Sequence, residues 1–168
     1  YIREWGMEQL IRDSRITQLY EGTNGIQALD LISRKLARDS GKMLKDTHEL
    51  FEDMVARIQL PEDKLIAADI LEDWLSTSEQ VKQQGATELA GAATDYLNFS
   101  AYSLLGVIWL SMKDVASRSD NDVLKQGKAQ TCDFYIKRLL PRRDVHKQNL
   151  LSGADDLLAI SNQGYDYQ

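Results

Sequence analysis

The chain has 168 residues, of which 43 % are hydrophobic and 27 % charged, and its formal net charge is −6. This length and apolar content suffice to bury the core of one globular domain, or of one domain and part of another. The acidic balance argues against a nucleic-acid surface and an anionic membrane surface, because either partner needs a surplus of Lys and Arg. Residues 1–41 carry six basic and six acidic side chains, so the acidic excess lies downstream and the first segment can accept an anionic ligand.

The cysteine content and the hydropathy of the sequence indicate where in the cell the protein is located. Cys132 is the single cysteine, so no internal disulfide forms, and we expect a cytoplasmic protein. The longest uncharged run, between Asp95 and Lys113, is shorter than the roughly 20 apolar residues that cross a bilayer. We expect this run to form a buried core helix, without membrane insertion. The chain starts without a Met or a signal sequence, so we expect it to be part of a longer protein.

Helical spacing of apolar residues dominates the first quarter of the chain, and no segment sustains the alternation of a half-buried strand. The first helix is predicted over residues 1–16, where Glu8 and Arg12 are spaced to pair one turn apart. A second helix follows a glycine-rich turn and ends at Asp39-Ser40-Gly41. Its predicted apolar stripe comprises Ile26, Leu29, Ile32 and Leu36.

The rest of the chain predicts further helices. A third helix is expected at about 42–59, and a fourth begins at Pro61, where a missing N–H costs nothing, and ends near Gly85. The segment 86–117 is the longest and most apolar, so we place it at the centre of a bundle. Residues 122–140 continue the helical pattern, and Pro141 either kinks one long helix or separates two. The tail from Ser161 is polar and is expected to fray.

These helices predict an all-α protein in two parts. Helices of this length joined by short links form antiparallel bundles. Residues 1–41 form a two-helix piece, and residues 42–168 form a bundle of four or five helices. Because two helices alone cannot bury a large apolar face, the first piece either packs on the bundle or ends a domain that continues outside this chain.

The turn between the first two helices combines a carboxylate with two glycines, in the order Glu21-Gly22-Thr23-Asn24-Gly25. Asn24 with Gln27 three residues later resembles a capping box, and Thr23 is an alternative N-cap. The free N–H groups and the positive end of the helix dipole then face the turn, and the glycines allow close backbone approach. Taken alone, such a tripeptide is more typical of a plain interhelical corner.

The residue order around this turn matches a family. The segment RDSRITQLYEGTNGIQALDLISRKL, residues 12–36, closely resembles the end of the catalytic domain in flavin-dependent acyl-CoA dehydrogenases, and YIREWGMEQLIRDSRI continues the match upstream. In that family the Tyr-Glu-Gly-Thr element joins the last helices of a C-terminal four-helix domain. The remainder resembles, more loosely, the additional helical domain of a branch that includes the methylthiopropanoyl-CoA dehydrogenase type. The matching elements there are Ala93-Thr94-Asp95-Tyr96-Leu97, Phe134-Tyr135, Arg138-Leu139-Leu140-Pro141 and Gly153-Ala154-Asp155.

The resemblance implies a role for each residue of the turn. Glu21 would take the proton from the carbon next to the thioester carbonyl of an acyl-CoA, while the neighbouring carbon delivers hydride to FAD. The product would be the 2,3-enoyl-CoA, and an electron-transfer acceptor would reoxidise the flavin. Gly22 would lie against the substrate, and Thr23, Asn24 and Gly25 would line the FAD. Such a base must be held at contact distance in a site that excludes water.

The family's flavin-binding sheet domain, its N-terminal helical domain and the Gly-Gly loop expected before Tyr1 are absent from this chain. We therefore expect the isolated polypeptide neither to hold FAD firmly nor to turn over acyl-CoA. Apolar surface left uncovered by the absent domains favours self-association, so we expect a homo-oligomer. The alternative function is a non-enzymatic helical interaction or oligomerisation module that uses an inherited fold.

Other residues that suggest chemistry have plainer interpretations. His48 stands among acidic residues, but without a second His or Cys at ligand spacing we expect a solvated face and no metal site. His146 is interpreted as a surface residue, and Arg142 and Arg143 as a charged link between helices rather than a phosphate site. Cys132 is expected to be a packed or partly exposed thiol. The core is predicted to include Trp74, Phe99, Tyr102 and Trp109.

Overall fold

The computed structural model describes residues 3–19 and 22–159. Every regular element in those two ranges is helical, which confirms the predicted all-α class. The α-helices are α1 (Met7–Ser14), α2 (Asn24–Leu29), α3 (Lys42–Ala56), α4 (Pro61–Lys82), α5 (Ala86–Ser117), α6 (Asp122–Phe134), α7 (Arg142–Leu151) and α8 (Asp155–Ala159). Short 3₁₀ turns η1 (Arg3–Trp5) and η2 (Arg15–Gln18) flank α1, and π-helical segments η3 (Asp30–Ala37) and η4 (Tyr135–Leu139) continue α2 and α6.

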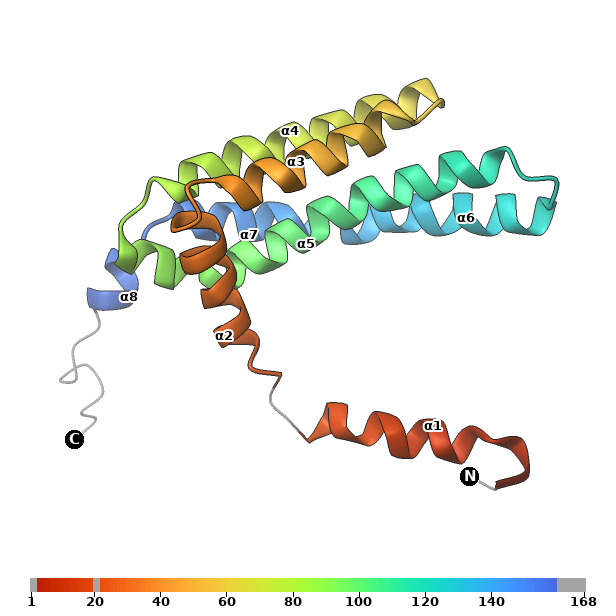
Figure 1. Cartoon of the computed structure of the whole chain (residues 1–168), viewed down its shortest axis with the longest axis horizontal. Coiled ribbons are helices and arrows are strands. Elements are labelled where there is room, and N and C mark those ends of the chain that lie inside the picture. Colours follow the sequence, from red (N-terminus) through yellow and green to blue (C-terminus); the bar gives the residue numbers. More distant parts are fainter. Residues whose placement is uncertain (1–2, 20–21, 160–168) are drawn as a thin grey trace.

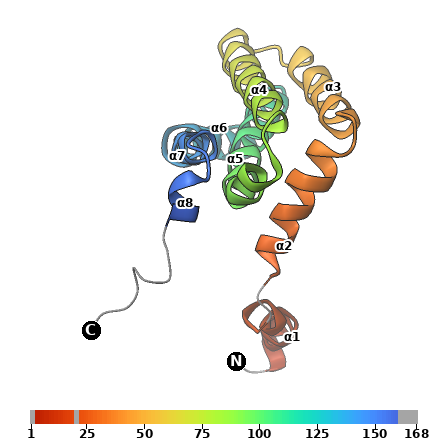
Figure 2. The same ribbon diagram turned by 90° about the vertical axis from the view of Figure 1, so that its left-hand side faces the viewer.

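Helix α5 lies at the centre of the bundle, as its apolar sequence predicts. It packs against α2, α3, α4, α6 and α7. The α3–α4 hairpin lies along one side of α5, and α6 followed by α7 runs back along another (Figures 1 and 2). Helix α1 stands apart from the bundle at the N-terminal end of the chain (Figure 1). The bundle is thus antiparallel and α2 is the N-terminal helix that packs on it.

Local signals explain where the bundle helices begin. Pro61 is the first residue of α4, followed by Glu62 and Asp63 in the first turn, where negative charge favours the helix dipole. At α6 the side chain of Asn121 accepts a hydrogen bond from the backbone N–H of Leu124 at 3.1 Å, which satisfies one of the free donors of the helix end. The predicted start of α4 and both predicted bounds of α5 are confirmed.

The core between α4 and α5 contains large aromatic side chains whose polar atoms are paired. Trp74, Tyr96 and Phe99 are each at most 2 % exposed. The Trp74 indole N–H donates to Ser100 Oγ at 3.0 Å, and the Tyr96 hydroxyl donates to Ser78 Oγ at 3.1 Å. Burying each ring stabilises the fold by about 1.5–3 kcal/mol, and the hydrogen bonds fix the register of the two helices.

The first helix differs from the prediction. Instead of one helix over residues 1–16, a left-handed Gly6 at φ +66° separates η1 from α1, and α1 ends at Ser14 in a 3₁₀ turn. Only glycine adopts this conformation without strain, so the chain turns where helical spacing alone predicts continuity. The predicted pair of Glu8 and Arg12 is confirmed as an ion pair one turn apart.

Pro141 kinks a helical rod rather than separating two helices. Leu140 and Pro141 both keep right-handed helical angles, and α7 resumes at Arg142. Before the proline, the N–H of Leu140 donates to the carbonyl of Tyr135 at 2.9 Å, five residues back. This wider turn accommodates a residue that lacks an N–H and whose ring clashes with the carbonyl four residues before it.

Candidate functional site

The predicted site turn is described from Gly22 onward, and Glu21 lies outside the described residues. Gly22 has φ +23°, and Thr23 is left-handed at φ 45° and ψ 32°. Helix α2 starts at once with Asn24. The side chains of Thr23 and Asn24 and the backbone of Gly25 are exposed, whereas Gly22 is half-buried. The chain therefore presents three of the four predicted ligand-contacting residues on an open surface.

Of the two predicted N-cap candidates, the structure selects Thr23, so the capping box of Asn24 with Gln27 is wrong. The side chain of Thr23 makes no capping hydrogen bond. The backbone carbonyl of Thr23 accepts a hydrogen bond from the N–H of Gln27 at 2.8 Å, which starts the hydrogen bonding of α2. A capping hydroxyl normally requires an extended N-cap residue, and the left-handed angles of Thr23 turn its side chain away from that geometry.

The two glycines differ in the room around them. A Cβ on Gly22 would stand 2.5 Å from Asn24 Oδ1, in a conformation that side chains disfavour. A Cβ on Gly25 would meet no heavy atom within 4 Å. The positive φ therefore explains glycine at Gly22, because the close atom is the end of the exposed Asn24 side chain and can move. Neither backbone strain nor packing within the described chain explains glycine at Gly25.

The apolar stripe of α2 and η3 is only half as predicted. Ile32 and Leu36 are fully buried, but Ile26 and Leu29 are 64 % and 42 % exposed, and Ala28 takes their place in the buried stripe. A π-helix has more residues per turn than an α-helix, so the side chains of η3 point in other directions than α-helical spacing predicts. Residues that would share one face of an α-helix therefore lie on different faces here. The helix therefore presents one face to the bundle and leaves a second apolar face open.

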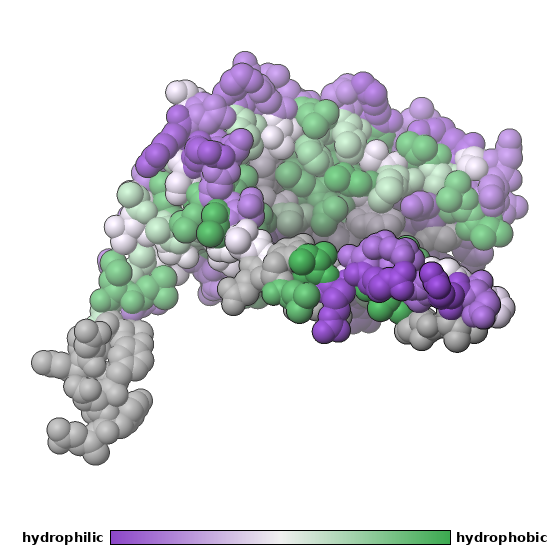
Figure 3. Space-filling model, turned by 60° about the horizontal axis from the view of Figure 1, so that its bottom comes forward, coloured by the Kyte–Doolittle hydropathy of each residue, from purple (hydrophilic) through white to green (hydrophobic). Residues whose placement is uncertain are grey.

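Helix α1 buries none of its side chains, although its sequence is amphipathic. The exposed apolar side chains of this N-terminal segment are Trp5, Met7, Leu10, Ile11, Ile16 and Leu19. Ile26 and Leu29 of α2 are exposed as well, and Figure 3 shows separate apolar areas among polar ones on this side of the molecule. Exposed apolar side chains gathered at one end of a chain are typical of an interaction site.

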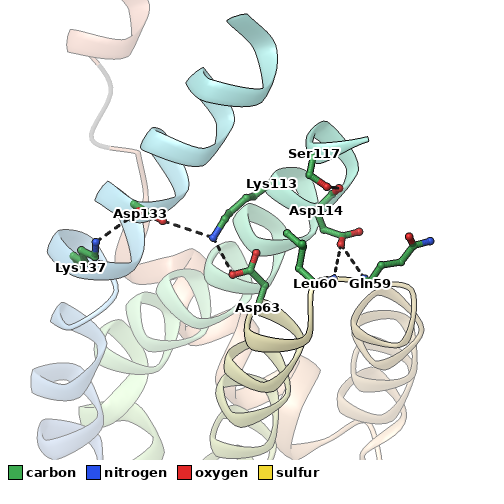
Figure 4. Close-up of polar contacts among 8 residues, drawn as sticks. All are labelled: Gln59, Leu60, Asp63, Lys113, Asp114, Ser117, Asp133 and Lys137. Atoms are coloured by element: carbon green, nitrogen blue, oxygen red, sulfur yellow. Dashed lines mark hydrogen bonds and ion pairs between the residues drawn. The ribbon is translucent and has the colours of Figure 1, made fainter. Parts of the chain in front are cut away.

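A buried carboxylate that sequence spacing does not reveal ties the α3–α4 loop to α5. Asp114 Oδ1 accepts hydrogen bonds from the backbone N–H groups of Gln59 at 2.8 Å and Leu60 at 2.9 Å (Figure 4). Burial by itself would raise the pKa of Asp114, but the hydrogen bond from Arg118 and those from the two N–H groups outweigh it and hold the pKa below its ordinary value. The partners lie more than 50 residues apart in sequence, so no local motif predicts them.

Lys113 links three helices through neighbouring carboxylates. Its Nζ lies 2.9 Å from Asp63 Oδ1 on α4 and 3.7 Å from Asp133 Oδ1 on α6 (Figure 4). Burial disfavours the charged amine, but the hydrogen bond and charge of Asp63 raise the pKa of Lys113 overall. Beside it, Cys132 is fully buried, and burial raises the pKa of its thiol to about 11. The packed, unreactive thiol expected from the sequence is confirmed.

Helix α7 is joined to the bundle by its charged residues. Arg143 lies 3.4 Å from Asp73 Oδ2 of α4, and Lys147 pairs with the same carboxylate. His146, interpreted as a surface residue, is only partly exposed: its ring stacks on Tyr102 and places Nδ1 2.6 Å from Asp95 Oδ1 on α5. The expectation that Arg143 forms a structural link is confirmed.

The remaining polar clusters and grooves of the described residues are formed by residues paired with one another or exposed on helix faces. His48 lies on the face of α3 with Glu52 4.0 Å away, and no group of three metal-ligating side chains occurs within residues 3–19 and 22–159. A groove of about 370 Å³ between α3 and α5 has Arg57 and Arg118 at its edges, each already paired with an aspartate of its own helix. No helix in the described part of the chain is long and apolar enough to cross a membrane.

The sequence of this helical chain matches a known protein family. A family described as "Acetyl-CoA dehydrogenase C-terminal like" matches residues 35–161. The chain belongs to this acetyl-CoA dehydrogenase C-terminal-like family. The match spans the bundle from η3 to α8 and confirms the resemblance of this region to an added C-terminal domain.

Individual relatives extend the similarity across the turn. The chain is 27 % identical to a 3-methylmercaptopropionyl-CoA dehydrogenase of Ruegeria pomeroyi, over 96 % of this chain and 29 % of the relative. It is also 27 % identical to a broad-specificity linear acyl-CoA dehydrogenase, FadE5, of Mycobacterium tuberculosis, over 98 % of this chain and 30 % of the relative. A butyryl-CoA dehydrogenase of Syntrophomonas wolfei is 27 % identical over 84 % of this chain and 25 % of its own length.

The chain thus spans less than a third of the length of these relatives. The alignment with the Ruegeria pomeroyi relative covers 96 % of the 168 residues, so about seven residues at the ends of the chain lie outside it. Residue 21 therefore lies within the aligned range. The family match begins at residue 35 and covers the bundle without the turn. Similarity to named dehydrogenases therefore includes both the bundle and the turn before it.

Proposed function

We propose that this chain is the C-terminal part of an FAD-dependent acyl-CoA dehydrogenase that oxidises an acyl-CoA thioester to the 2,3-enoyl-CoA. Glu21 is the base: its carboxylate removes the proton from the carbon next to the thioester carbonyl. The observation that carries this proposal is the open Gly22–Gly25 turn at the junction of an uncovered α1 and a bundle-bound α2, within a segment similar to named acyl-CoA dehydrogenases.

Different residues of the turn contact the substrate and the FAD. Gly22, whose positive φ disfavours any side chain, lies against the substrate. Thr23, Asn24 and Gly25 border the FAD, which accepts the hydride from the neighbouring carbon of the substrate. The exposed backbone of Gly25 leaves space for a flat ring system. Burial against an acyl chain raises the pKa of a carboxyl group, whereas a helix N-terminus lowers it, and the balance sets the basicity of Glu21.

The uncovered apolar surface on α1 and α2 is the place where the rest of the dehydrogenase docks. Covering Trp5, Leu10 and Ile26 removes apolar area from water and closes a wall around the turn, which excludes water from the reacting carbon. The same surface leads the isolated chain to self-associate, and the complete protein is a cytoplasmic homo-oligomer that passes electrons to an electron-transfer acceptor. The substrate class is an acyl-CoA thioester.

The test uses the complete protein that contains this chain. Glu21→Gln removes the base with little change of shape, so turnover of acyl-CoA should fall by at least 10³-fold while the flavin absorbance band and its stoichiometry stay unchanged. The matched control is Asp30→Asn, which neutralises a carboxylate on the same helical rod whose partner is Arg34 at 2.6 Å, and which should retain near-normal turnover.

Two results would contradict the proposal. The first is normal turnover in Glu21→Gln, and the second is a complete protein that binds no flavin, which would favour the non-enzymatic interaction module. For the isolated chain, mixing with FAD followed by gel filtration should return a colourless protein. A stoichiometric yellow complex would show that the other domains are not needed to hold the cofactor.

A further inference from the structure

The buried stripe of α2 and η3 connects the site turn to the bundle. Ala28, Ile32 and Leu36 follow one another at intervals of four residues, and all three are 0 % exposed. Ala28 is four residues after the first residue of α2, so a single helical turn separates the buried anchor from the exposed turn. A displacement of this anchor would therefore be transmitted almost undiminished to Thr23 and Gly22.

The partner of this stripe is the added bundle. Helix α2 packs against α5, and η3 packs against α3, α4 and α5 (Figures 1 and 2). On the other side of the turn, α1 and its flanking 3₁₀ segments have no buried side chain among residues 3–17. Within the described chain, the bundle alone determines where the turn stands.

The local backbone makes the connection stiff. The residues from Asn24 to Ala37 keep helical angles without interruption through the change from α-helical to π-helical winding at Asp30. A π-helical segment is uncommon and persists only where surrounding contacts stabilise it, and such segments occur often at functional sites. The burial of Ile32 and Leu36 supplies those contacts here. The small side chain of Ala28 lets α2 approach its neighbour closely.

We infer that Ala28, Ile32 and Leu36 are positioning residues, through which α5 of the added bundle holds the Gly22–Gly25 turn in the place that proton abstraction requires. This inference rests on the proposed function of Glu21. Because reaction rates fall steeply when a catalytic group is displaced by about 1 Å, the bundle contributes to catalysis without touching the substrate.

The test compares two buried positions in the complete protein. Ala28→Leu forces α2 away from α5, and Ile32→Ala leaves a cavity under η3. Each should lower kcat per bound flavin by about 10-fold or more, with KM within threefold of normal. The kinetic isotope effect with substrate deuterated next to the carbonyl should rise, because proton removal by a displaced base becomes slower relative to the other steps. Ile32→Val should restore most of the rate.

The matched control is Leu110→Ala, at an equally buried residue in the other half of α5. It destabilises the fold by a similar cavity, so it should lower the melting temperature and the yield of flavoprotein while kcat per flavin and the isotope effect stay normal. If Ala28→Leu and Ile32→Ala behave like this control while Glu21→Gln abolishes turnover, the positioning role is overturned and the proposed function stands. If Glu21→Gln retains turnover, both fall.

Discussion

The bundle and the N-terminal segment handle apolar residues in opposite ways. In the bundle Trp74, Tyr96 and Phe99 are almost completely buried and their polar atoms are paired, whereas Trp5 of the N-terminal segment is 77 % exposed and α1 buries none of its side chains. An amphipathic helix gains its stability mainly from packing its apolar face. The bundle therefore has a buried aromatic core, although it too exposes apolar side chains such as Leu65 and Val123, whereas the described residues of α1 have no buried core at all.

The turn of the candidate site lies at the boundary between these two regions. The rod of α2 and η3 has both properties, since Ala28, Ile32 and Leu36 belong to the bundle core while Ile26 and Leu29 are exposed like the apolar residues of α1. This location suits a site that the bundle positions on one side and that the rest of a larger protein covers on the other. Three substitutions test the contrast.

The largest effect is expected from deleting a ring in the bundle core. Phe99→Ala removes a fully buried side chain at the centre of α5 and should lower the free energy of unfolding of this chain by about 3–5 kcal/mol. Trp5→Ala is the matched control, because it deletes a larger ring from the exposed segment and should change that free energy by less than about 0.5 kcal/mol. Urea unfolding followed by circular dichroism measures both. Equal effects would mean that α1 packs on the bundle.

The next effect concerns the carboxylate that ties the α3–α4 loop to α5. Asp114→Asn weakens the hydrogen bonds to the N–H groups of Gln59 and Leu60 and removes the partner of Arg118, so we expect a loss of about 1–3 kcal/mol near neutral pH.

The pH dependence of that loss has a defined sign. Because the folded protein lowers the pKa of Asp114 from its ordinary 3.8, its stabilisation is present above that value and disappears as the pH falls through the folded pKa. The difference between wild type and Asp114→Asn should therefore be constant at about pH 5–7 and shrink below about pH 4. A difference that grows on acidification would show that the carboxylate is destabilising when charged.

The smallest effect on stability is expected at the turn. Gly25→Ala adds a methyl group where no atom lies within 4 Å, so the free energy of unfolding of this chain should change by less than about 0.5 kcal/mol. In the complete protein the same methyl group should obstruct the flavin and lower its retention on gel filtration. The control Ser33→Ala, at a partly exposed residue on the same helical rod, should leave both properties unchanged. Full flavin retention in Gly25→Ala would show that Gly25 does not border the flavin.

Much of the bundle follows from local sequence. Pro61 starts α4, and the apolar run between charged ends gives α5 with both of its bounds, because these signals act within one or two helical turns. The division between the buried and exposed faces of α2 was predicted wrongly, since the π-helical winding of η3 depends on tertiary contacts that no spacing records. The same limit applies to Asp114 and His146, whose partners lie more than 50 residues away.

For the site, the residue order was more informative than geometry. The Glu21-Gly22-Thr23 order indicates the family. Of the two N-cap candidates, Thr23 rather than Asn24 occupies the position, but its left-handed angles, which propensities do not reveal, leave it without a side-chain capping bond. The role of Glu21 and the domain division near residue 41 remain predictions.

The most direct test of the central claim follows the proton itself. When the complete flavoprotein is incubated with acyl-CoA in D₂O under anaerobic conditions, hydrogen at the carbon next to the carbonyl should exchange with solvent, as NMR can follow. We predict that Glu21→Gln abolishes this exchange while Asp30→Asn preserves it and both retain flavin. Exchange at the normal rate in Glu21→Gln would show that another group removes the proton, and would contradict the account.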